Sequence, residues 1–150
     1  MRRALSLAAA ALVSTSVACR VGAHEQATGV VKERMDAMEL MAKAMKAITA
    51  RIKEKRGLDP IAGDARAIHA AATRMPSLFP PGTTDHPSGA KPVIWRNWPD
   101  FEGKARALVT ESAKLAEMES RDAKALAAQV RRVSDACSSC HELYRTKDHH

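Results

Sequence analysis

Apolar residues recur at three- and four-residue steps in four stretches of the chain, and this period limits the fold more than any other feature. From Gly29 to about Glu54 the apolar positions are Val31, Met35, Met38, Met41 or Ala42, Met45, Ile48 and Ile52. This spacing places them on one face of an α-helix of about seven turns. A helix with one apolar face must bury that face against other elements, so the stretch favours a helical bundle.

Three further stretches repeat the period. The second predicted helix follows Pro60 and ends at Met75, the third opens at Pro92, and the fourth is capped by Ser120 or Asp122. Aromatic residues make up 3% of the chain, and the abundant Ala, Leu, Met, Lys, Arg and Glu lose little side-chain freedom in a helix. The sequence therefore predicts an all-α fold, an antiparallel up-down-up-down four-helix bundle.

Glycine and proline mark the boundaries of these helices. Gly57 is available to end the first helix in a left-handed conformation, and Pro99 can kink the first turns of the third. Residues 76–92 contain five prolines and two glycines, which predicts a long irregular connection. A loop of this length in a small domain is usually ordered for a reason or crosses the end of a bundle.

The first residues have the pattern of a secretory leader. Two arginines precede residues 4–17, of which ten are Ala, Leu or Val, and small residues at 21–23 stand where a signal peptidase cuts. We therefore expect residues 1–23 to be a cleaved signal peptide and residues 24–150 to be the mature domain. A lipoprotein signal ending at Cys19 is an alternative, but it lacks the usual Leu three positions before the cysteine.

The leader changes the meaning of the net charge. The whole chain carries +7, and loss of residues 1–23 removes three arginines and no acid, which leaves +4. The other lysines and arginines are spread over polar helix faces beside acids, a pattern typical of a solvated surface. No other stretch approaches the ~20 apolar residues of a spanning helix. We expect neither nucleic-acid binding nor stable membrane insertion.

The last predicted helix carries the motif Cys137-Ser138-Ser139-Cys140-His141, which holds both thiols of the mature chain. Two cysteines and a histidine at this spacing have three chemical uses: covalent haem attachment, half of a zinc site, or a dithiol redox pair. A structural zinc site needs four ligands, and the chain has no second Cys pair or His-x3-His unit to complete one. A redox dithiol is typical of a βαβ unit, and no such pattern is visible.

Haem c agrees with every residue of the motif. Thioether bonds from Cys137 and Cys140 to neighbouring vinyl groups bring the helix to the ring edge, and His141 can then place its neutral imidazole on the iron. Export also matches the compartment in which bacteria attach c-type haem. We expect one haem c in the chain. From the motif alone, an alternative stays open in which the cysteines are small buried residues and the histidine lies on the surface.

A ligand for the other side of the iron would come from the first helix, which starts at the end of the bundle where the fourth helix finishes. At ~1.5 Å per residue, Met35, Met38 and Met41 lie at depths that can face the haem, and Met45 lies deeper. Methionine is also a common core filler. Periodicity alone does not choose among these residues.

Four groups of residues are similar to those of a known protein family. They are Val31-Lys32-Glu33-Arg34 with Met38 four residues later, the segment 78–83, Pro92-Val93-Ile94-Trp95 with Trp98 and Phe101, and the haem motif with Tyr144-Arg145. Together they make the mature chain resemble the class II c-type cytochromes, the cytochrome c′ and cytochrome c-556 family. A haem motif near the C-terminus is itself characteristic of that class.

The resemblance implies a four-helix bundle with haem held between the first and fourth helices. In cytochrome c-556 a methionine at the position of Met38 binds iron, whereas cytochrome c′ commonly has a noncoordinating apolar residue there. Met38 is therefore the expected axial ligand opposite His141. Arg34 matches a family arginine that can pair with a haem propionate. Arg145 matches the family's basic residue four positions after the haem histidine.

These ligands imply a periplasmic one-electron carrier of a Gram-negative bacterium rather than an enzyme. Thioether sulfur stabilises ferrous iron, and two filled axial positions keep the iron geometry nearly constant. The alternative is binding of nitric oxide or carbon monoxide at a distal haem position, as in cytochrome c′. Expected partners are redox proteins that dock weakly and in a salt-sensitive way. The resemblance also allows a homodimer through the first two helices.

Overall fold

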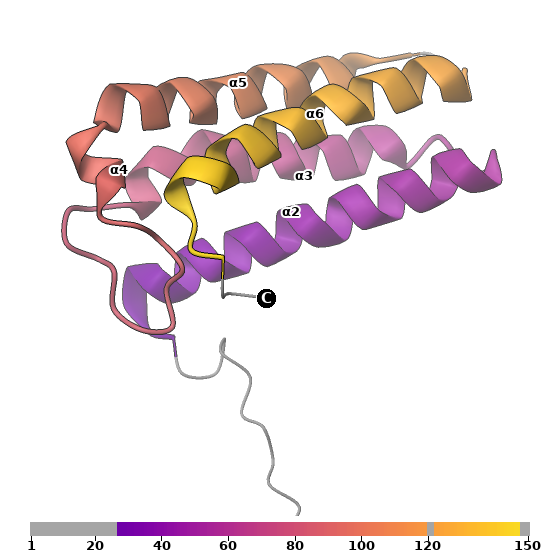
Figure 1. Ribbon diagram of the computed structural model, residues 1–150. Coiled ribbons are helices and arrows are strands. Elements are labelled where there is room, and N and C mark those ends of the chain that lie inside the picture. Colours follow the sequence, from indigo (N-terminus) through magenta and orange to yellow (C-terminus); the bar gives the residue numbers. More distant parts are fainter. Residues whose placement is uncertain (1–26, 120–121, 148–150) are drawn as a thin grey trace, which may run out of the picture.

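Four long helices form the computed structural model, which describes residues 27–119 and 122–147. They are α2 (Gly29–Glu54), α3 (Ile61–Arg74), α5 (Trp98–Glu117) and α6 (Ala123–Tyr144). Consecutive long helices run in opposite directions, which confirms the up-down-up-down four-helix bundle (Figure 1). The predicted leader, Cys19 and Ser120 lie outside the described residues.

The first two long helices begin and end close to the predicted residues, with one difference at the end of α2. The residue that ends α2 in the left-handed region is Lys55, with φ 53°, and its N–H bonds to the carbonyls of Arg51 and Ile52. Gly57 is also left-handed, with φ 59°, and lies in the junction that follows. The sequence therefore located this turn correctly and misplaced the cap by two residues.

The third predicted helix is broken into two, α4 (Val93–Arg96) and α5. Asn97 separates them with non-helical dihedrals, φ −126° and ψ 42°. In a continuous helix the ring of Pro99 would clash with the carbonyl four residues earlier, so the chain leaves the helix before the proline. The expected kink is thus a complete break. A short 3₁₀ helix, η1 (Met75–Leu78), also extends α3 into the predicted loop, which starts at residue 79.

The fourth long helix, which begins at Ala123, is capped as predicted by Asp122. Its side chain accepts a hydrogen bond from the backbone N–H of Lys124 at 3.0 Å, which satisfies one of the free donors of the first turn. None of the helices in the described ranges is both long enough and apolar enough to cross a membrane.

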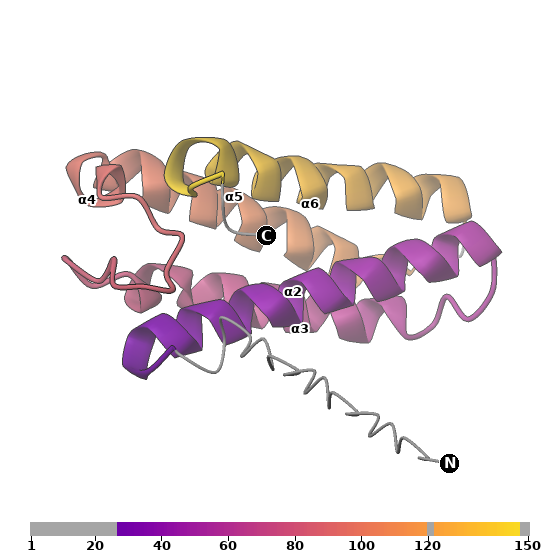
Figure 2. The same ribbon diagram turned by 60° about the horizontal axis from the view of Figure 1, so that its bottom comes forward.

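The bundle has two different ends. At the end we call the junction end, short connections join α2 to α3 and α5 to α6. At the other, the loop end, residues 79–92 form the long connection, and α2 starts where α6 finishes (Figure 1). The ribbons of α2 and α6 separate toward the loop end, as both views show (Figure 2). These two helices pack together less closely than α2 with α3 or α5 with α6.

Candidate functional site

The residues of the Cys-x-x-Cys-His motif lie in the last turns of α6, close to the loop end. Cys137 and Cys140 are half-buried free thiols that pack against the hydrophobic core. His141 is half-buried on the same helix. Spacings of three and four residues put the three side chains on neighbouring positions of one helix face. The motif is therefore at the inner edge of α6, with its side chains neither fully exposed nor enclosed.

Burial sets the protonation states of these groups. It raises the pKa of the Cys137 thiol and raises that of Cys140 to about 11. It also lowers the pKa of His141, with a smaller contribution from the positive charge of Arg145. The fold thus favours neutral thiols and a neutral imidazole, and a neutral imidazole is the form that binds metal. A redox dithiol instead needs a thiol with a lowered pKa, which this environment does not supply.

The zinc alternative also lacks support from the residues that the structure describes. Among residues 27–119 and 122–147, no group of three or more His, Cys, Asp or Glu side chains is arranged to hold a metal ion. A structural zinc site has four such ligands. The donor set on α6, two thiols and one imidazole within five residues, instead fits covalent haem, which needs two thioethers and one protein nitrogen from this helix.

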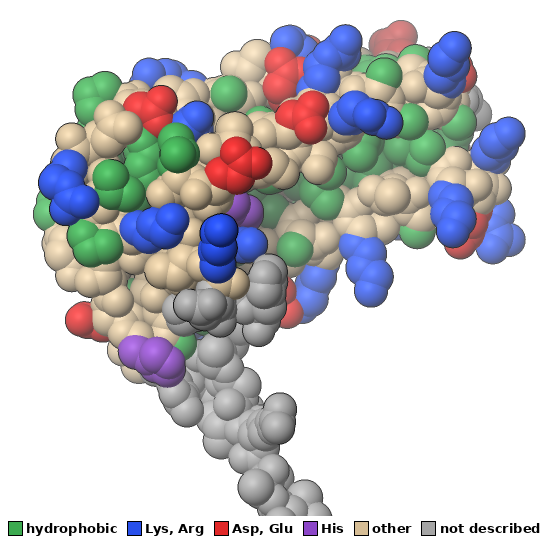
Figure 3. All heavy atoms as spheres, viewed as in Figure 1, with side chains coloured by type: hydrophobic (Ala, Val, Ile, Leu, Met, Phe, Trp, Pro, Cys, Tyr) green, Lys and Arg blue, Asp and Glu red, His purple; other side chains and the backbone are tan. Residues whose placement is uncertain are grey.

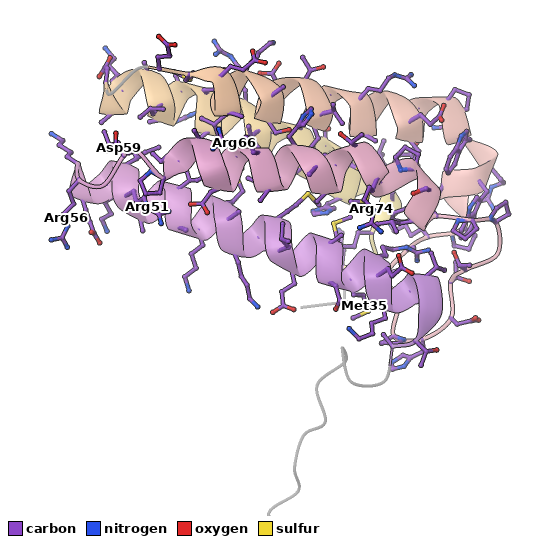
Figure 4. All side chains as sticks on the ribbon, turned by 180° about the vertical axis from the view of Figure 1, so that it is seen from behind. Met35, Arg51, Arg56, Asp59, Arg66 and Arg74 are labelled. Atoms are coloured by element: carbon purple, nitrogen blue, oxygen red, sulfur yellow. The ribbon has the colours of Figure 1, made fainter. Side chains whose placement is uncertain are left out.

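The methionines of α2 occupy different environments. Met41 is 6% exposed and belongs to the core, whereas Met38 and Met45 are half-buried and pack against it. Met35 lies on the side of α2 away from α3 (Figure 4). Met38 is one helical turn closer to the loop end than Met41 and two turns closer than Met45. Met38, Met45 and the two cysteines of α6 all pack against the same hydrophobic core.

The space between α2 and α6 has the character that a haem requires. Hydrophobic side chains line the hollow between these helices, and charged side chains of both signs surround it on the same face (Figure 3). Both helices contribute partly buried apolar residues that pack against the core, and the two helices pack loosely against each other. The residues present therefore fit an apolar group between α2 and α6.

Arg34 is buried, with 4% of its surface exposed, and its guanidinium group binds the long loop. Its Nε and Nη2 donate to the carbonyl of Leu78, at 3.0 and 2.9 Å. Its Nη1 donates to the Thr83 carbonyl at 2.9 Å and to Ser88 Oγ at 2.8 Å, and Nη2 also donates to Thr83 Oγ1 at 2.6 Å. The group also lies 4.0 Å from the centre of the Phe79 ring.

These contacts engage the whole guanidinium group of Arg34. A guanidinium has five N–H donors, and the five hydrogen bonds use all of them. Burial also lowers the pKa of this group. A contact with a haem propionate stays a prediction, and it would require one of the loop hydrogen bonds to be exchanged. In the structure, Arg34 binds the loop residues Thr83 and Ser88.

Other residues singled out from the sequence also lie near the loop end. Arg145 is exposed at the end of α6, where its N–H donates to the carbonyl of His141 at 3.1 Å. Trp95 is half-buried in α4, and its Nε1 donates to the Phe79 carbonyl at 2.9 Å. Phe79 is therefore held on two sides: Arg34 lies over its ring, and Trp95 donates to its backbone carbonyl.

The sequence did not reveal a polar network beside the motif. Tyr144 donates from its hydroxyl to Asp100 Oδ2 at 2.6 Å and accepts from Asn97 Nδ2 at 2.9 Å. Burial, followed by the contact with Asp100, raises the pKa of Tyr144 to about 12. Lys104 lies 4.0 Å from Asp100, and its positive charge partly offsets the effect of burial on the pKa of Cys140. The only sequence signal of this network is the four-residue spacing of Cys140 and Tyr144 on α6 and of Asp100 and Lys104 on α5.

Comparison with known proteins gives consistent matches. The family model described as Cytochrome C' matches residues 29–145. Cytochrome c-556 of Agrobacterium tumefaciens is 31% identical over 126 residues, which cover 79% of this chain and 98% of that protein. Cytochrome c′ of Allochromatium vinosum is 31% identical over 150 residues, which cover 96% of this chain and 95% of that protein.

Solved structures show the same architecture. A cytochrome c′ described by its ligand-controlled dimer dissociation superposes with a TM-score of 0.71 at 28% identity, covering 81% of this chain and 99% of that one. The nitric oxide complex of a cytochrome c′ variant from Alcaligenes xylosoxidans gives a TM-score of 0.71 at 27% identity, covering 79% and 94%. The similarity extends over the whole bundle.

Proposed function

The chain belongs to the cytochrome c′ family, whose members bind covalently attached haem c, and on this premise we propose that it is a monohaem one-electron carrier. We propose Cys137 and Cys140 as the thioether residues and His141 as one axial ligand. Met38 is the proposed second ligand. Proteins of this family are electron carriers or gas-binding haem proteins, and the choice between these two roles depends on the iron ligand from α2.

The position of Met38 is the observation that carries the proposal. It is half-buried, it packs against the hydrophobic core against which both cysteines also pack, and it comes from the helix that faces α6 across the loosely packed side of the bundle. Met41, one turn away, is already enclosed by core residues. Met45 shares the half-buried state of Met38 but lies two turns farther from the loop end, where His141 is, and this difference supports the choice of Met38.

Each residue has a distinct part in electron transfer. When bound, haem c supplies an iron that gains and loses one electron. His141 offers a neutral imidazole because burial disfavours its protonated form. Met38 offers a thioether sulfur, which favours the ferrous state. Packing on two helices holds both side chains in place, so little rearrangement accompanies the change of charge.

The spectrum of the haem-loaded protein tests this ligation. We expect a low-spin ferric spectrum for the unmodified chain and a high-spin one for Met38→Ala, because the variant leaves one axial position empty. Met45→Ala is the matched control, since Met45 is also half-buried, on the same helix and packed against the same core. A high-spin spectrum of the unmodified protein, or one unaffected by Met38→Ala, would overturn the assignment.

Binding of nitric oxide or carbon monoxide is the second candidate function. Similarity to cytochrome c′ favours it, because the related Alcaligenes protein is known as a nitric oxide complex. Mixing the ferrous protein with carbon monoxide separates the two roles. Slow, limited binding that becomes rapid in Met38→Ala supports the electron carrier, whereas rapid binding by the unmodified protein supports the gas-binding role.

We further propose that residues 1–23 direct export to the periplasm and that the partners are redox proteins. A homodimer through α2 and α3 is part of this proposal, and a related cytochrome c′ is described as a dimer whose dissociation is controlled by ligand. On the outer side of these helices Leu40 is 45% exposed, beside Ala47 and Ala67. Sedimentation of the haem-loaded protein and of Leu40→Glu tests this; a monomer at all concentrations would exclude the dimer.

A further inference from the structure

The two helices that carry the proposed iron ligands make little direct contact near the loop end. Met38 lies on α2 and His141 on α6, and the ribbons of these helices separate there (Figure 2). Residues 79–92 run beside both helices at this end (Figure 1). The loop therefore offers a connection between α2 and α6 that their own packing does not supply.

On the α2 side the connection is made by Arg34. Three of its hydrogen bonds go to Thr83 and Ser88 in the loop and two go to the Leu78 carbonyl at the end of η1, and each acceptor is a neutral carbonyl or hydroxyl oxygen. Buried hydrogen bonds from a charged donor are stronger than those between neutral groups. Arg34 lies one turn before Met38, about 6 Å along the helix axis. Its hold on the loop thus fixes the part of α2 that presents Met38.

On the α6 side the connection is made by the backbone. The N–H of Lys91 donates to the Tyr144 carbonyl at 2.9 Å, and the N–H of Thr146 donates to the Gly89 carbonyl at 2.9 Å. Ala90 and Arg145 form an antiparallel bridge between these bonds. The chain just after His141 is therefore paired with residues 89–91 in the manner of a short β-ladder.

Ser88 joins the two sides. Its hydroxyl oxygen accepts from Arg34 Nη1 at 2.8 Å and from the backbone N–H of Ala90 at 3.2 Å, and the residue is 9% exposed. A hydroxyl oxygen has two lone pairs, so both bonds can exist together. A path of hydrogen bonds and covalent backbone therefore runs from α2 through Ser88 and Ala90 to Lys91, whose N–H bonds to the end of α6.

We propose that residues 79–92 form a strap that sets the separation of α2 and α6, and that Arg34 and Ser88 are positioning residues for the bond between Met38 and iron. The proposal rests on the proposed function insofar as Met38 is the ligand. When the strap is loosened, α2 is free to move away from α6. The Met38 bond then breaks more often, and the distal position opens to added ligands.

Ser88→Ala in the haem-loaded protein tests both parts of the proposal. It removes the acceptor shared by Arg34 and Ala90 and leaves two donors in a buried position. We expect hydrogen exchange at the Lys91 and Thr146 amides to become about tenfold faster. We expect carbon monoxide to bind the ferrous protein about tenfold faster as well, because the competing Met38 bond opens more often.

Ser112→Ala is the matched control. Ser112 is a fully buried serine of α5 whose hydroxyl donates to the Leu108 carbonyl at 2.7 Å, outside the strap. It should leave both rates unchanged even if it lowers stability. Thr83→Val is a milder strap variant, because it removes one acceptor of Arg34 and keeps the shape of the side chain. Its effects should have the same sign as those of Ser88→Ala and be smaller.

The outcomes separate this proposal from the proposed function. Unchanged exchange of the Lys91 and Thr146 amides in both strap variants would overturn the strap, whichever residue binds iron. Faster exchange with an unchanged carbon monoxide rate and spin state would overturn the positioning role. The comparison of Met38→Ala with Met45→Ala tests the ligand itself and does not depend on the strap.

Discussion

The junction end and the loop end of the bundle are packed by different kinds of side chain. At the junction end the most buried residues are aliphatic: Ile48, Ile61, Leu115 and Leu126. At the loop end lie all five of the Phe, Trp and Tyr residues of the chain: Phe79, Trp95, Trp98, Phe101 and Tyr144. Three ring pairs around Phe101 have centroids 4.8 to 5.4 Å apart.

The ends also differ in how their helices are held together. At the junction end the charged side chains of Arg56 and Asp59 are exposed, and Arg51 is half-buried where it pairs with Asp64 of α3 (Figure 4). At the loop end a charged residue, Arg34, is inside and fully hydrogen-bonded. At the junction end aliphatic packing is joined by an ion pair between Arg51 and Asp64 and by hydrogen bonds from the buried Gln129 to Glu111. The other end is closed by hydrogen bonds across a loop, which leaves space between α2 and α6.

Loss of both thioethers should have the largest effect and should fall on the loop end. In Cys137→Ala/Cys140→Ala no haem can remain covalently attached, and haem staining after denaturing electrophoresis should be lost completely. Hydrogen exchange should then accelerate in the first turns of α2 more than at the junction end, because the α2–α6 space loses its filling. Equal acceleration of exchange at both ends would contradict the proposal that the haem stabilises the loop end more than the junction end.

Truncation of Leu115 should give the next largest effect and report on the junction end. Leu115 is fully buried, and Leu115→Ala should lower the free energy of unfolding by about 3 kcal/mol through lost burial and a cavity. Leu143→Ala is the control, since Leu143 is 50% exposed and its loss should cost less than about 0.5 kcal/mol. Urea unfolding measures both variants. Similar losses of unfolding free energy would contradict the larger contribution expected from the buried aliphatic core.

Tyr144→Phe should have a smaller effect, confined to the loop end. It removes the hydrogen bonds to Asp100 and Asn97 and should cost about 1 kcal/mol in urea unfolding. The pKa of Tyr144 is raised to about 12 from 10.0, so folding favours the protonated phenol. Its stabilisation is complete below pH 10.0 and is lost as the pH rises toward about 12. The unmodified protein should therefore lose more stability in this window than Tyr144→Phe; parallel pH profiles would refute the assignment.

Removal of a surface ion pair on α2 should have the smallest effect. Lys43 pairs with Glu39 one turn earlier, and both side chains are well exposed. Lys43→Ala should change the free energy of unfolding by less than about 0.5 kcal/mol, because water and salt screen such pairs. The pair lies within one helix and so does not set the position of α2 against its neighbours. A loss as large as that of Tyr144→Phe would show that the pair contributes more than its exposure predicts.

The sequence predicts the junction end better than the loop end. The apolar period sets the extents of α2, α3 and α6, and Asp122 caps α6 through a contact only two residues away. Helical periodicity and capping are local, so they can be recognised in a single stretch of sequence. The break at Asn97 is also local, although Pro99 alone does not show whether a helix bends or stops.

The strap depends on contacts that have no local pattern. Arg34 is buried, but the apolar period of its helix identifies neither its burial nor its partners. Those partners, such as Thr83 and Ser88, are polar loop residues of an ordinary kind. Among the methionines, the family resemblance rather than periodicity selects Met38, because Met38 and Met41 share the same period; the structure adds that Met41 is enclosed by the core and Met38 is half-buried.

The long reach of Arg34 also has a consequence for the order of folding. The hydrogen bonds that join the loop to α2 and α6 connect residues 44 or more positions apart, whereas α2 and α3 are neighbours along the chain. Contacts between distant residues carry a larger entropic cost of chain closure and form later. We therefore expect the hairpin of α2 and α3 to form first and the strap to close last. During that interval the thiols of Cys137 and Cys140 would still be open to the machinery that attaches haem.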